Sequence, residues 1–190
     1  LLADNSTWLI VADFDKQNWQ AEGLNFIKAC KDKNIPAYLE RSSSGNGAHV
    51  WIFFKNNYSA HRCRKVIIAI LEETNIFSPF NKASSYDRLF PNQDFHSGKG
   101  LGNLIALPFH KVNLAHPNTC FLDTSSFEPF QDQWGFLASI QRVEHAVFDQ
   151  LYDLLGIRKP MKRSLPRLAV NLKYPCTNPY AFLSLACRRD

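Results

Sequence analysis

The stretch WLIVADFD, residues 8–15, organises the chain because an apolar run ends in two acids. The run predicts a buried strand over Trp8–Asp13 whose end emerges at a surface. In an extended segment, residues two apart point to one face, so Asp13 and Asp15 converge while Phe14 turns into the core. Two neighbouring carboxylates repel, and a divalent cation such as Mg²⁺ or Mn²⁺ relieves that repulsion. A strand end followed by a solvated helix cap is the commoner origin of such a pair.

The segments beyond this stretch alternate between helical and strand patterns. Apolar residues three and four apart predict helices over 18–31 and 59–75, and Ser59 caps the second. Two further helices and five further strands are expected, the helices over 131–141 and 143–155 and the strands over 37–41, 49–54, 84–90, 103–109 and 120–122. The glycine-containing connector at 91–102 predicts that the strands on either side of it form a hairpin.

This order predicts an α/β (α+β) fold, with helices on the faces of a sheet. Residues 1–156 are expected to form the compact core. The pattern degrades from Ile157, where the prolines and basic residues of KPMKRSLPR predict a linker or C-terminal tail over 157–190.

The composition favours a globular protein with an anionic partner. Net charge is +5 and the pI is near 9.0, which suits nucleic acid, although many basic domains bind none. No run of about 18 apolar residues occurs that could cross a membrane. Five scattered cysteines without a C-x-x-C pair predict a reduced, cytoplasmic protein, with Cys30 and Cys63 packed in its core. The first residues lack signal-peptide features and are typical of a fragment boundary.

A second polar cluster, RSSSGNGAHVW at residues 41–51, lies between two expected strands. Its serines and glycines leave backbone N–H groups free to form an anion-binding nest, and Gly45 and Gly47 permit close approach by a ligand. His49 opens the next strand and can reach the same anion, while Arg41 can add charge-assisted hydrogen bonds. A plain β-turn with a structural histidine is the alternative.

A third acid follows in SYDRLFPNQD, residues 85–94. Asp87 falls within an otherwise apolar strand, where an unpaired carboxylate is costly, so a shared metal would explain its presence. An ion pair with Arg88 at an exposed strand edge is the alternative. Asp94 lies in the following turn, where acids are common, and remains a second candidate for the third acid.

In combination, an acid pair, a Ser-Gly-x-Gly-x-His segment and a strand acid form a set suited to phosphoryl transfer. Three carboxylates can hold two metals about 4 Å apart. One metal would activate a primer 3′-hydroxyl and the other would neutralise the triphosphate, with His49 orienting the phosphate oxygens.

These segments resemble, in order and wording, the archaeo-eukaryotic primase superfamily, and most closely the primase-polymerase domains of TOTE conflict systems. The resemblance runs from Trp8 to Ile140 and rests on VADFDK, ERSSSGNGAHVWIFF, SYDRLFPNQD and GNLIALPFHK. It implies metal-binding, catalytic roles for Asp13, Asp15 and Asp87. It also implies nucleotide contacts by the loop before the histidine and by the histidine: Ser44, Gly45, Asn46, Gly47 and His49. Lys111 of the last segment is expected to contact the nucleotide or the template.

The resemblance further implies a fold, an activity and partners. An N-terminal α/β lobe would pack on an RRM-like lobe, with the active cleft between them. The activity implied is that of a DNA primase-polymerase that uses Mg²⁺ or Mn²⁺, a DNA template and primer, and (d)NTPs in a bacterial conflict or replication setting. Family members are often fused to a helicase, so the chain would be a short member or an excised domain with a possible helicase partner.

Two other functions fit parts of the sequence. A single-strand-binding module would use the aromatic strand HVWIFF and the basic charge, but it has no need of three acids together. A metal-dependent nuclease or replication initiator needs a nucleophilic tyrosine, for which Tyr86 is available, and a histidine-rich metal site, for which no H-x-H pair exists. Zinc is not expected, because His110, His116 and Cys120 lack a clear fourth ligand.

Overall fold

The computed structural model describes residues 1–77, 83–96, 98 and 104–157, so the expected tail lies outside it apart from its first residue, Ile157. The strands are β1 (Ser6–Asp15), β2 (Tyr38–Arg41), β3 (Gly47–Ser59) and β4 (Tyr86–Phe90). The helices are α1 (Trp19–Lys31), α2 (Ala60–Glu73), α3 (Lys111–Leu114), α4 (Gln133–Ser139) and α5 (His145–Ile157). Within these ranges, no helix combines the length and the apolar character that a membrane crossing requires.

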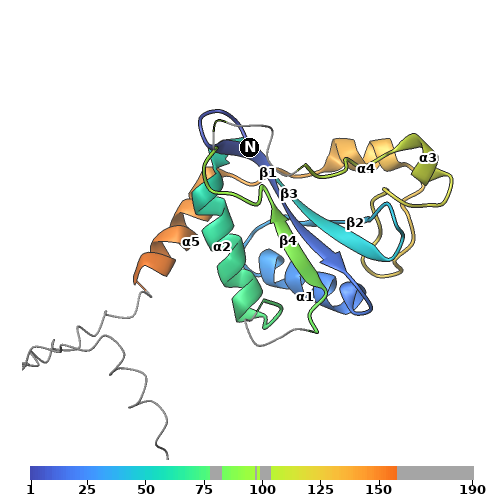
Figure 1. Cartoon of the computed structure of the whole chain (residues 1–190), viewed down its shortest axis with the longest axis horizontal. Coiled ribbons are helices and arrows are strands. Elements are labelled where there is room, and N and C mark those ends of the chain that lie inside the picture. The colour runs from blue at the N-terminus through green and yellow to red at the C-terminus, as the bar shows by residue number, and fades with distance from the viewer. Residues whose placement is uncertain (78–82, 97, 99–103, 158–190) are drawn as a thin grey trace, which may run out of the picture. The chain divides into compact units, whose positions relative to one another are not determined.

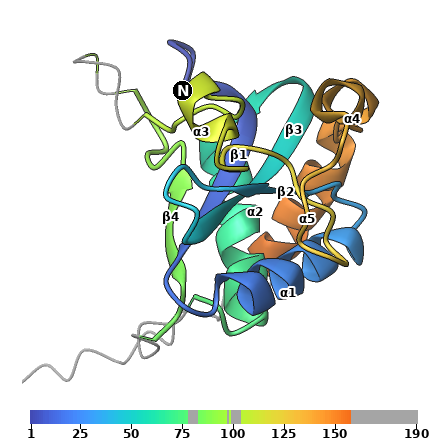
Figure 2. The ribbon, with the colours of Figure 1, turned by 90° about the vertical axis from the view of Figure 1, so that its right-hand side faces the viewer.

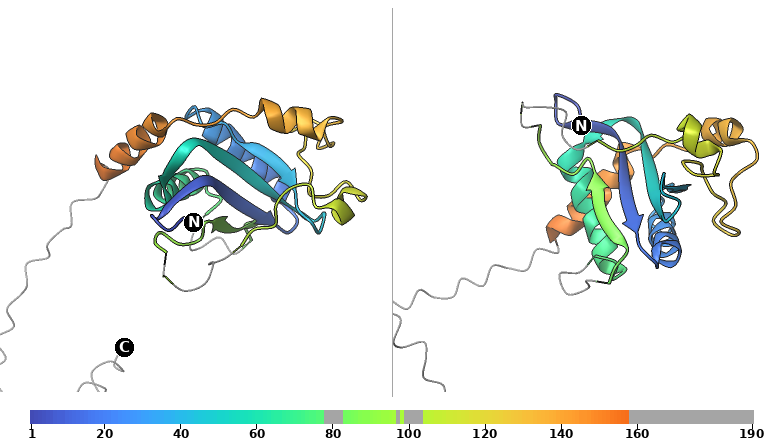
Figure 3. Two further views of the ribbon diagram at one scale, coloured as in Figure 1. Left: turned by 90° about the horizontal axis from the view of Figure 1, so that it is seen from above. Right: turned by 45° about the vertical axis from the view of Figure 1, so that its right-hand side comes forward.

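The four strands form one antiparallel sheet in the order β2-β3-β1-β4 (Figure 1). β1 pairs with β3 on one side and with β4 on the other, and both views of Figure 3 show β4 beside β1 at the edge of the sheet. The element order β-α-β-β-α-β with this strand order is the split β-α-β, or ferredoxin-like, arrangement. The expected mixed α/β class is therefore confirmed.

One face of the sheet carries the main hydrophobic core. Alternate residues of β1, namely Ile10, Ala12 and Phe14, point into it and are buried, as the strand period requires. Helices α1, α2 and α5 pack against this face. Cys30 and Cys63 are buried there, as expected, and their burial raises the pKa of both thiols.

The opposite face carries a smaller apolar cluster. Val11, Trp51, Phe90 and Phe121 are its buried members, and side chains of the segment 104–140 pack against them. This segment includes the short helices α3 and α4. Figure 2 shows α3 near the top of the view and α1 near the bottom. The segment thus covers part of the face that the long helices leave open.

The hairpin expected between 84–90 and 103–109 is wrong for the described residues. Residues 104–109 form no strand, and β4 pairs only with β1 within the described part of the chain. Ile105 and Phe109 instead pack against the smaller apolar cluster. Pro108 lacks the backbone N–H that a strand needs to hydrogen-bond with its neighbour. The apolar pattern of this segment reflects burial against the sheet and not strand pairing.

The expected elements at 120–122 and 131–141 are reduced, whereas β3 extends beyond the expected 49–54 at both ends. Residues 120–122 form isolated bridges rather than a strand, and they lie along the free edge of β2, where Leu122 donates a backbone hydrogen bond to Leu39 at 2.9 Å. The helix expected over 131–141 shortens to α4, because the side chain of Asp132 caps its start by accepting from the N–H of Gly135 at 2.8 Å.

Candidate metal and nucleotide site

A row of polar and charged residues crosses all four strands on the face opposite the main core. Glu40 on β2 is the register partner of His49 on β3, His49 is the partner of Asp13 on β1, and Asp13 is the partner of Arg88 on β4. We call these four residues the charged row. Register partners in an antiparallel sheet present their side chains on the same face. The fold therefore gathers residues from four separate segments into one line.

A row of apolar residues runs parallel to the charged row, and on each strand the two rows are two residues apart. Its members are partners in the same way: Tyr38, Trp51, Val11 and Phe90. Because the strand period is two, both rows lie on the same face of the sheet. The apolar row belongs to the smaller cluster that the segment 104–140 covers.

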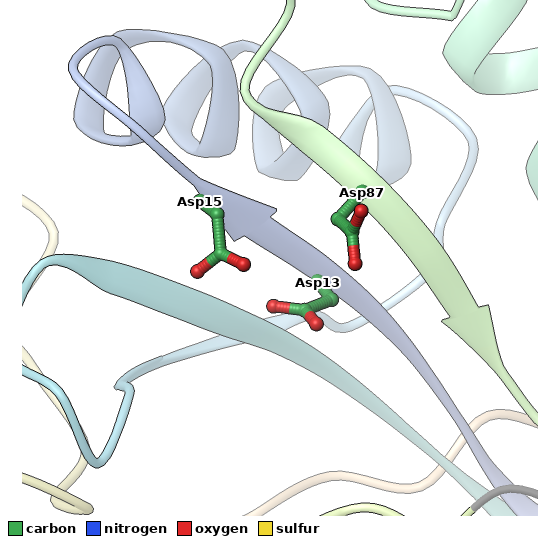
Figure 4. A group of neighbouring side chains, drawn as sticks. All are labelled: Asp13, Asp15 and Asp87. Atoms are coloured by element: carbon green, nitrogen blue, oxygen red, sulfur yellow. The ribbon is translucent and has the colours of Figure 1, made fainter.

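Three carboxylates meet at the β1–β4 side of the charged row. Asp13 and Asp15 lie two apart at the end of β1, and Asp87 lies on β4 (Figure 4). One oxygen from each lies within 4.8 Å of the oxygens of the other two. Figure 4 shows the three side chains pointing toward one another. Such a set of hard oxygen donors fits Mg²⁺ or Mn²⁺.

A β-bulge brings Asp87 to this position. Phe14 is the partner of Tyr86 and Asp13 is the partner of Arg88, so Asp87 is an extra residue without a partner on β1. Its expected burial is wrong, because the side chain is 36% exposed and forms an ion pair with Arg88. Asp87 lies at the edge of the sheet, so its charge stays solvated and needs no metal to justify it.

Asp94, the other candidate for the third acid, lies apart from this group. One of its oxygens is 3.0 Å from His61 Nδ1, and the other accepts from Arg64 Nε at 2.8 Å. These interactions hold the pKa of Asp94 below its ordinary value although partial burial works to raise it. Through these two contacts, Asp94 holds the turn after β4 against α2.

Burial governs the electrostatics of Asp13. Its side chain is 14% exposed, and burial raises its pKa to about 6, with further upward contributions from Asp15 and Asp87. His49 and Arg88 act in the opposite direction. The protein thus holds negative charge where it is costly, and a divalent cation between the carboxylates would offset that cost.

His49 lies between two carboxylates and is largely buried. Its Nε2 is 3.6 Å from Asp13 Oδ1, and its Nδ1 is 2.9 Å from Glu40 Oε2. Burial works to lower the pKa of His49, but the hydrogen bond to Glu40 and the negative charges of Glu40, Asp13 and Asp15 outweigh it and raise the pKa. The ring therefore holds a proton more tightly than a free imidazole does.

A cavity of about 600 Å³ adjoins the acids. Asp15 lies on its wall, as do Trp19, Arg41, Gly45 and Asn46. The cavity therefore joins Asp15 of the acid pair to the Ser-Gly-Asn-Gly loop, which lies about thirty residues away in the sequence. This is space in which a nucleotide could lie with its phosphates near the carboxylates.

The loop between β2 and β3 depends on its two glycines. Gly45 has a φ of +76°, which side chains disfavour. A Cβ on Gly47 would lie 2.6 Å from Asp15 Oδ1, so only glycine lets β3 approach β1 here. Two of the expected free N–H groups are engaged, since Gly45 N donates to the Ser42 carbonyl at 3.1 Å and Asn46 N donates to Ser44 Oγ at 3.2 Å. The loop is thus less open to an anion than its composition predicted.

The two basic residues expected at the nucleotide differ in their placement. Arg41 lines the cavity, and its guanidinium also donates to the carbonyls of Pro117 at 3.4 Å and Phe127 at 2.9 Å. Lys111 is exposed at the start of α3 and is not on the cavity wall. The hairpin that was to carry Lys111 does not form within residues 104–109.

Three residues that support the site were not expected from the sequence. Glu22 on α1 accepts three hydrogen bonds from Ser84 and Ser85, at 2.7 to 3.0 Å, and so fixes the entry to β4. Asn118 donates to the Ser43 carbonyl at 3.2 Å and braces the loop. Glu40 binds His49. Of the three, only Glu40 could have been noticed in the sequence. It lies two residues from Tyr38 in an expected strand, so the two side chains share one face of the sheet.

Comparison with protein-family models matches residues 1–151 to the archaeo-eukaryotic primase domain of the TOTE conflict system. Comparison with curated proteins finds no match. The matched range contains the three converging acids, the Ser-Gly-Asn-Gly loop and His49. It covers most of the chain, so this chain belongs to the archaeo-eukaryotic primase domain family of TOTE conflict systems, as its motifs predicted.

Proposed function

We propose that this chain is a DNA primase-polymerase that transfers a nucleotidyl group from a (d)NTP to the 3′-hydroxyl of a primer on a DNA template. Membership of the family implies a primase-like nucleotidyltransferase. The observation that carries the proposal further is the convergence of Asp13, Asp15 and Asp87 beside a cavity large enough for a nucleotide. Three acids whose carboxylates converge favour a metal-dependent enzyme over a binding module or a structural domain.

The three aspartates would hold two Mg²⁺ or Mn²⁺ ions. These ions, when bound, would activate the attacking hydroxyl and neutralise the charge of the triphosphate. His49 would donate from Nε2 to a phosphate oxygen, since that nitrogen faces Asp13. Arg41 would direct its remaining N–H groups into the cavity. Arg88 neutralises Asp87 in the free protein and could turn to a phosphate once Asp87 binds a cation.

The loop would shape the phosphate end of the cavity. Gly45 and Asn46 line it directly, Ser44 holds the loop closed through its hydroxyl, and Gly47 keeps β3 close to Asp15. Lys111, which is exposed away from the cavity wall, is better suited to the template or primer than to the nucleotide.

The same proposal extends to the organisation of the chain. Residues 1–156 form the catalytic core, and 157–190 form a basic linker or tail. The four-stranded split β-α-β sheet supports assigning this part of the chain to the RRM-like lobe. The described residues form no second sheet that would correspond to the expected N-terminal α/β lobe. A helicase domain or partner would supply single-stranded template. The described cysteines, Cys30, Cys63 and Cys120, are free and buried, which supports a reducing cytoplasm.

A primer-extension assay tests this function. The chain is mixed with a labelled primer on a DNA template, with dNTPs or rNTPs, and with Mg²⁺ or Mn²⁺. We expect template-directed extension that requires the cation and is absent in Asp13→Asn. Asp153→Asn, which changes an exposed acid on α5, serves as the matched control and retains activity. Shortened primer would indicate a nuclease instead, and binding without either product would indicate a binding module.

A further inference from the structure

A fully buried carboxylate ends the charged row on the side away from Arg88. Glu40 is 0% exposed, and its Oε2 accepts a hydrogen bond from Trp51 Nε1 and lies 2.9 Å from His49 Nδ1. Its other oxygen, Oε1, is buried without a hydrogen-bond partner among the described residues. An unsatisfied buried carboxylate oxygen costs free energy, and a neutral side chain would pack there more favourably. Packing alone therefore does not explain Glu40.

The two donors to Glu40 fix where the proton of His49 lies. An indole nitrogen only donates and an ionised carboxylate only accepts, so the hydrogen bond from His49 requires a proton on Nδ1. Nε2 is then the ring nitrogen that faces Asp13, at 3.6 Å from Oδ1. The buried ring of Trp51 packs edge-on against the imidazole, with centroids 6.2 Å apart, and limits its rotation.

We propose that Glu40 is a positioning residue that holds His49 with Nδ1 protonated and Nε2 directed at the acid cluster. β3 separates Glu40 from β1, so Glu40 acts on the site only through His49. The inference rests on the proposed function for one point alone, namely that Nε2, once the ring takes up a second proton, donates to a phosphate of the incoming nucleotide. A carboxylate suits this task because it offers His49 no donor, whereas the amide of glutamine can present an N–H and leave the proton on either ring nitrogen.

Nitrogen-15 NMR of the histidine-labelled full chain tests the positioning directly. Long-range correlation spectra identify the protonated ring nitrogen, and the His49 signals are recognised by their loss in His49→Ala. Without metal or nucleotide, at a pH high enough for a neutral ring, we expect the Nδ1–H form in the wild type. Glu40→Gln should lose this preference. Glu144→Gln, which removes an exposed carboxylate paired with Lys55, should keep it.

Two results of this experiment would overturn the proposal. One is a neutral His49 with its proton on Nε2 in the wild type, and the other is an unchanged His49 signature in Glu40→Gln. The wild-type spectrum decides the question even if Glu40→Gln does not fold. Because the spectra need no enzymatic activity, they test the positioning role separately from the proposed function.

A double-mutant cycle provides the functional readout. Supporting residues behind a functional histidine commonly contribute about 10- to 100-fold, so we expect Glu40→Gln to lower kcat/KM for the nucleotide by that factor. In the His49→Ala background the same change should cost less than about twofold. An equal loss in both backgrounds would show that Glu40 acts independently of His49. A wild type without any extension activity would refute the proposed function and leave the NMR result to decide the role of Glu40.

Discussion

The charged row and the apolar row lie side by side on one face of the same four strands, yet they serve different purposes. The apolar row, which includes Val11 and Trp51, is buried beneath side chains of the segment 104–140. The charged row stays partly accessible near Asp13 and Asp87 and borders the acid cluster. The two rows have the same backbone geometry. The difference lies in what covers them. A shift of two residues along each strand separates a packing surface from a candidate site.

The two rows should differ most in how activity and stability respond when side chains of β1 are truncated to alanine. We expect Asp13→Ala combined with Asp15→Ala to lower nucleotide incorporation by at least about 10³-fold, because the cations lose their ligands. The metal-free melting temperature should hold or rise, because like charges have been removed. Extension assays and thermal melts measure both effects.

Val11→Ala is the matched change in the apolar row. It should cost about 2 kcal/mol of unfolding free energy through lost packing, with activity per folded molecule preserved within about threefold. Substantial incorporation by the double acid variant would break the comparison, as would a Val11→Ala protein that folds stably but does not extend primers.

The next contrast concerns the third acid. Asp87→Asn keeps the shape of the side chain and removes the charge, so we expect a loss of about 10²-fold or more at saturating Mg²⁺. Asp94→Asn should retain most activity and lose about 1 kcal/mol of stability, because it weakens the contacts with His61 and Arg64. Rates across a Mg²⁺ and Mn²⁺ titration distinguish the two. An inactive Asp94→Asn variant together with an active Asp87→Asn variant would show that Asp94, and not Asp87 at the bulge, is the third acid.

His49 in the charged row allows use of the incoming nucleotide to be distinguished from binding of primer-template. We expect His49→Ala to lower kcat/KM for the incoming nucleotide by about 10²-fold, because one electrostatic contact with phosphate is lost. The affinity for primer-template should change little, since the ring faces Asp13. Steady-state kinetics and DNA-binding titrations provide the test. Parallel losses in both would indicate that His49 supports the fold instead.

The last contrast is a pH dependence of stability that belongs to Asp13. Its pKa is about 6 in the folded protein against 3.8 for the unperturbed group, so the fold favours the protonated form. The resulting destabilisation is absent below pH 3.8, grows between that value and about 6, and is complete above it. It amounts to roughly 3 kcal/mol at most.

Asp13→Asn removes this titration, which gives a direct comparison. The metal-free variant should gain stability relative to the wild type as the pH rises from 4 to 7, as measured by denaturant unfolding at each pH. A constant difference between the two proteins across this range would show that Asp13 titrates normally.

The sequence was informative where local periodicity determines structure. The apolar run before Asp13 and its i, i+2 acids predicted β1 and the convergence of its carboxylates, because a strand has a period of two. It was uninformative where position depends on pairing. The bulge that turns Asp87 toward Asp13 breaks the strand alternation, and Glu40 meets His49 only through the register of β2 with β3. Residues 104–109 misled because burial against a sheet leaves the same apolar pattern as a strand.

Binding of Mn²⁺ tests most directly whether the three carboxylates form a cation site. The electron paramagnetic resonance signal of free Mn²⁺ is titrated near neutral pH in the wild type, in Asp13→Asn with Asp87→Asn, and in Asp94→Asn as the matched control. We predict that the wild type and Asp94→Asn bind Mn²⁺ alike, and that the double variant binds at least about tenfold more weakly. Equal binding by all three proteins would contradict the account.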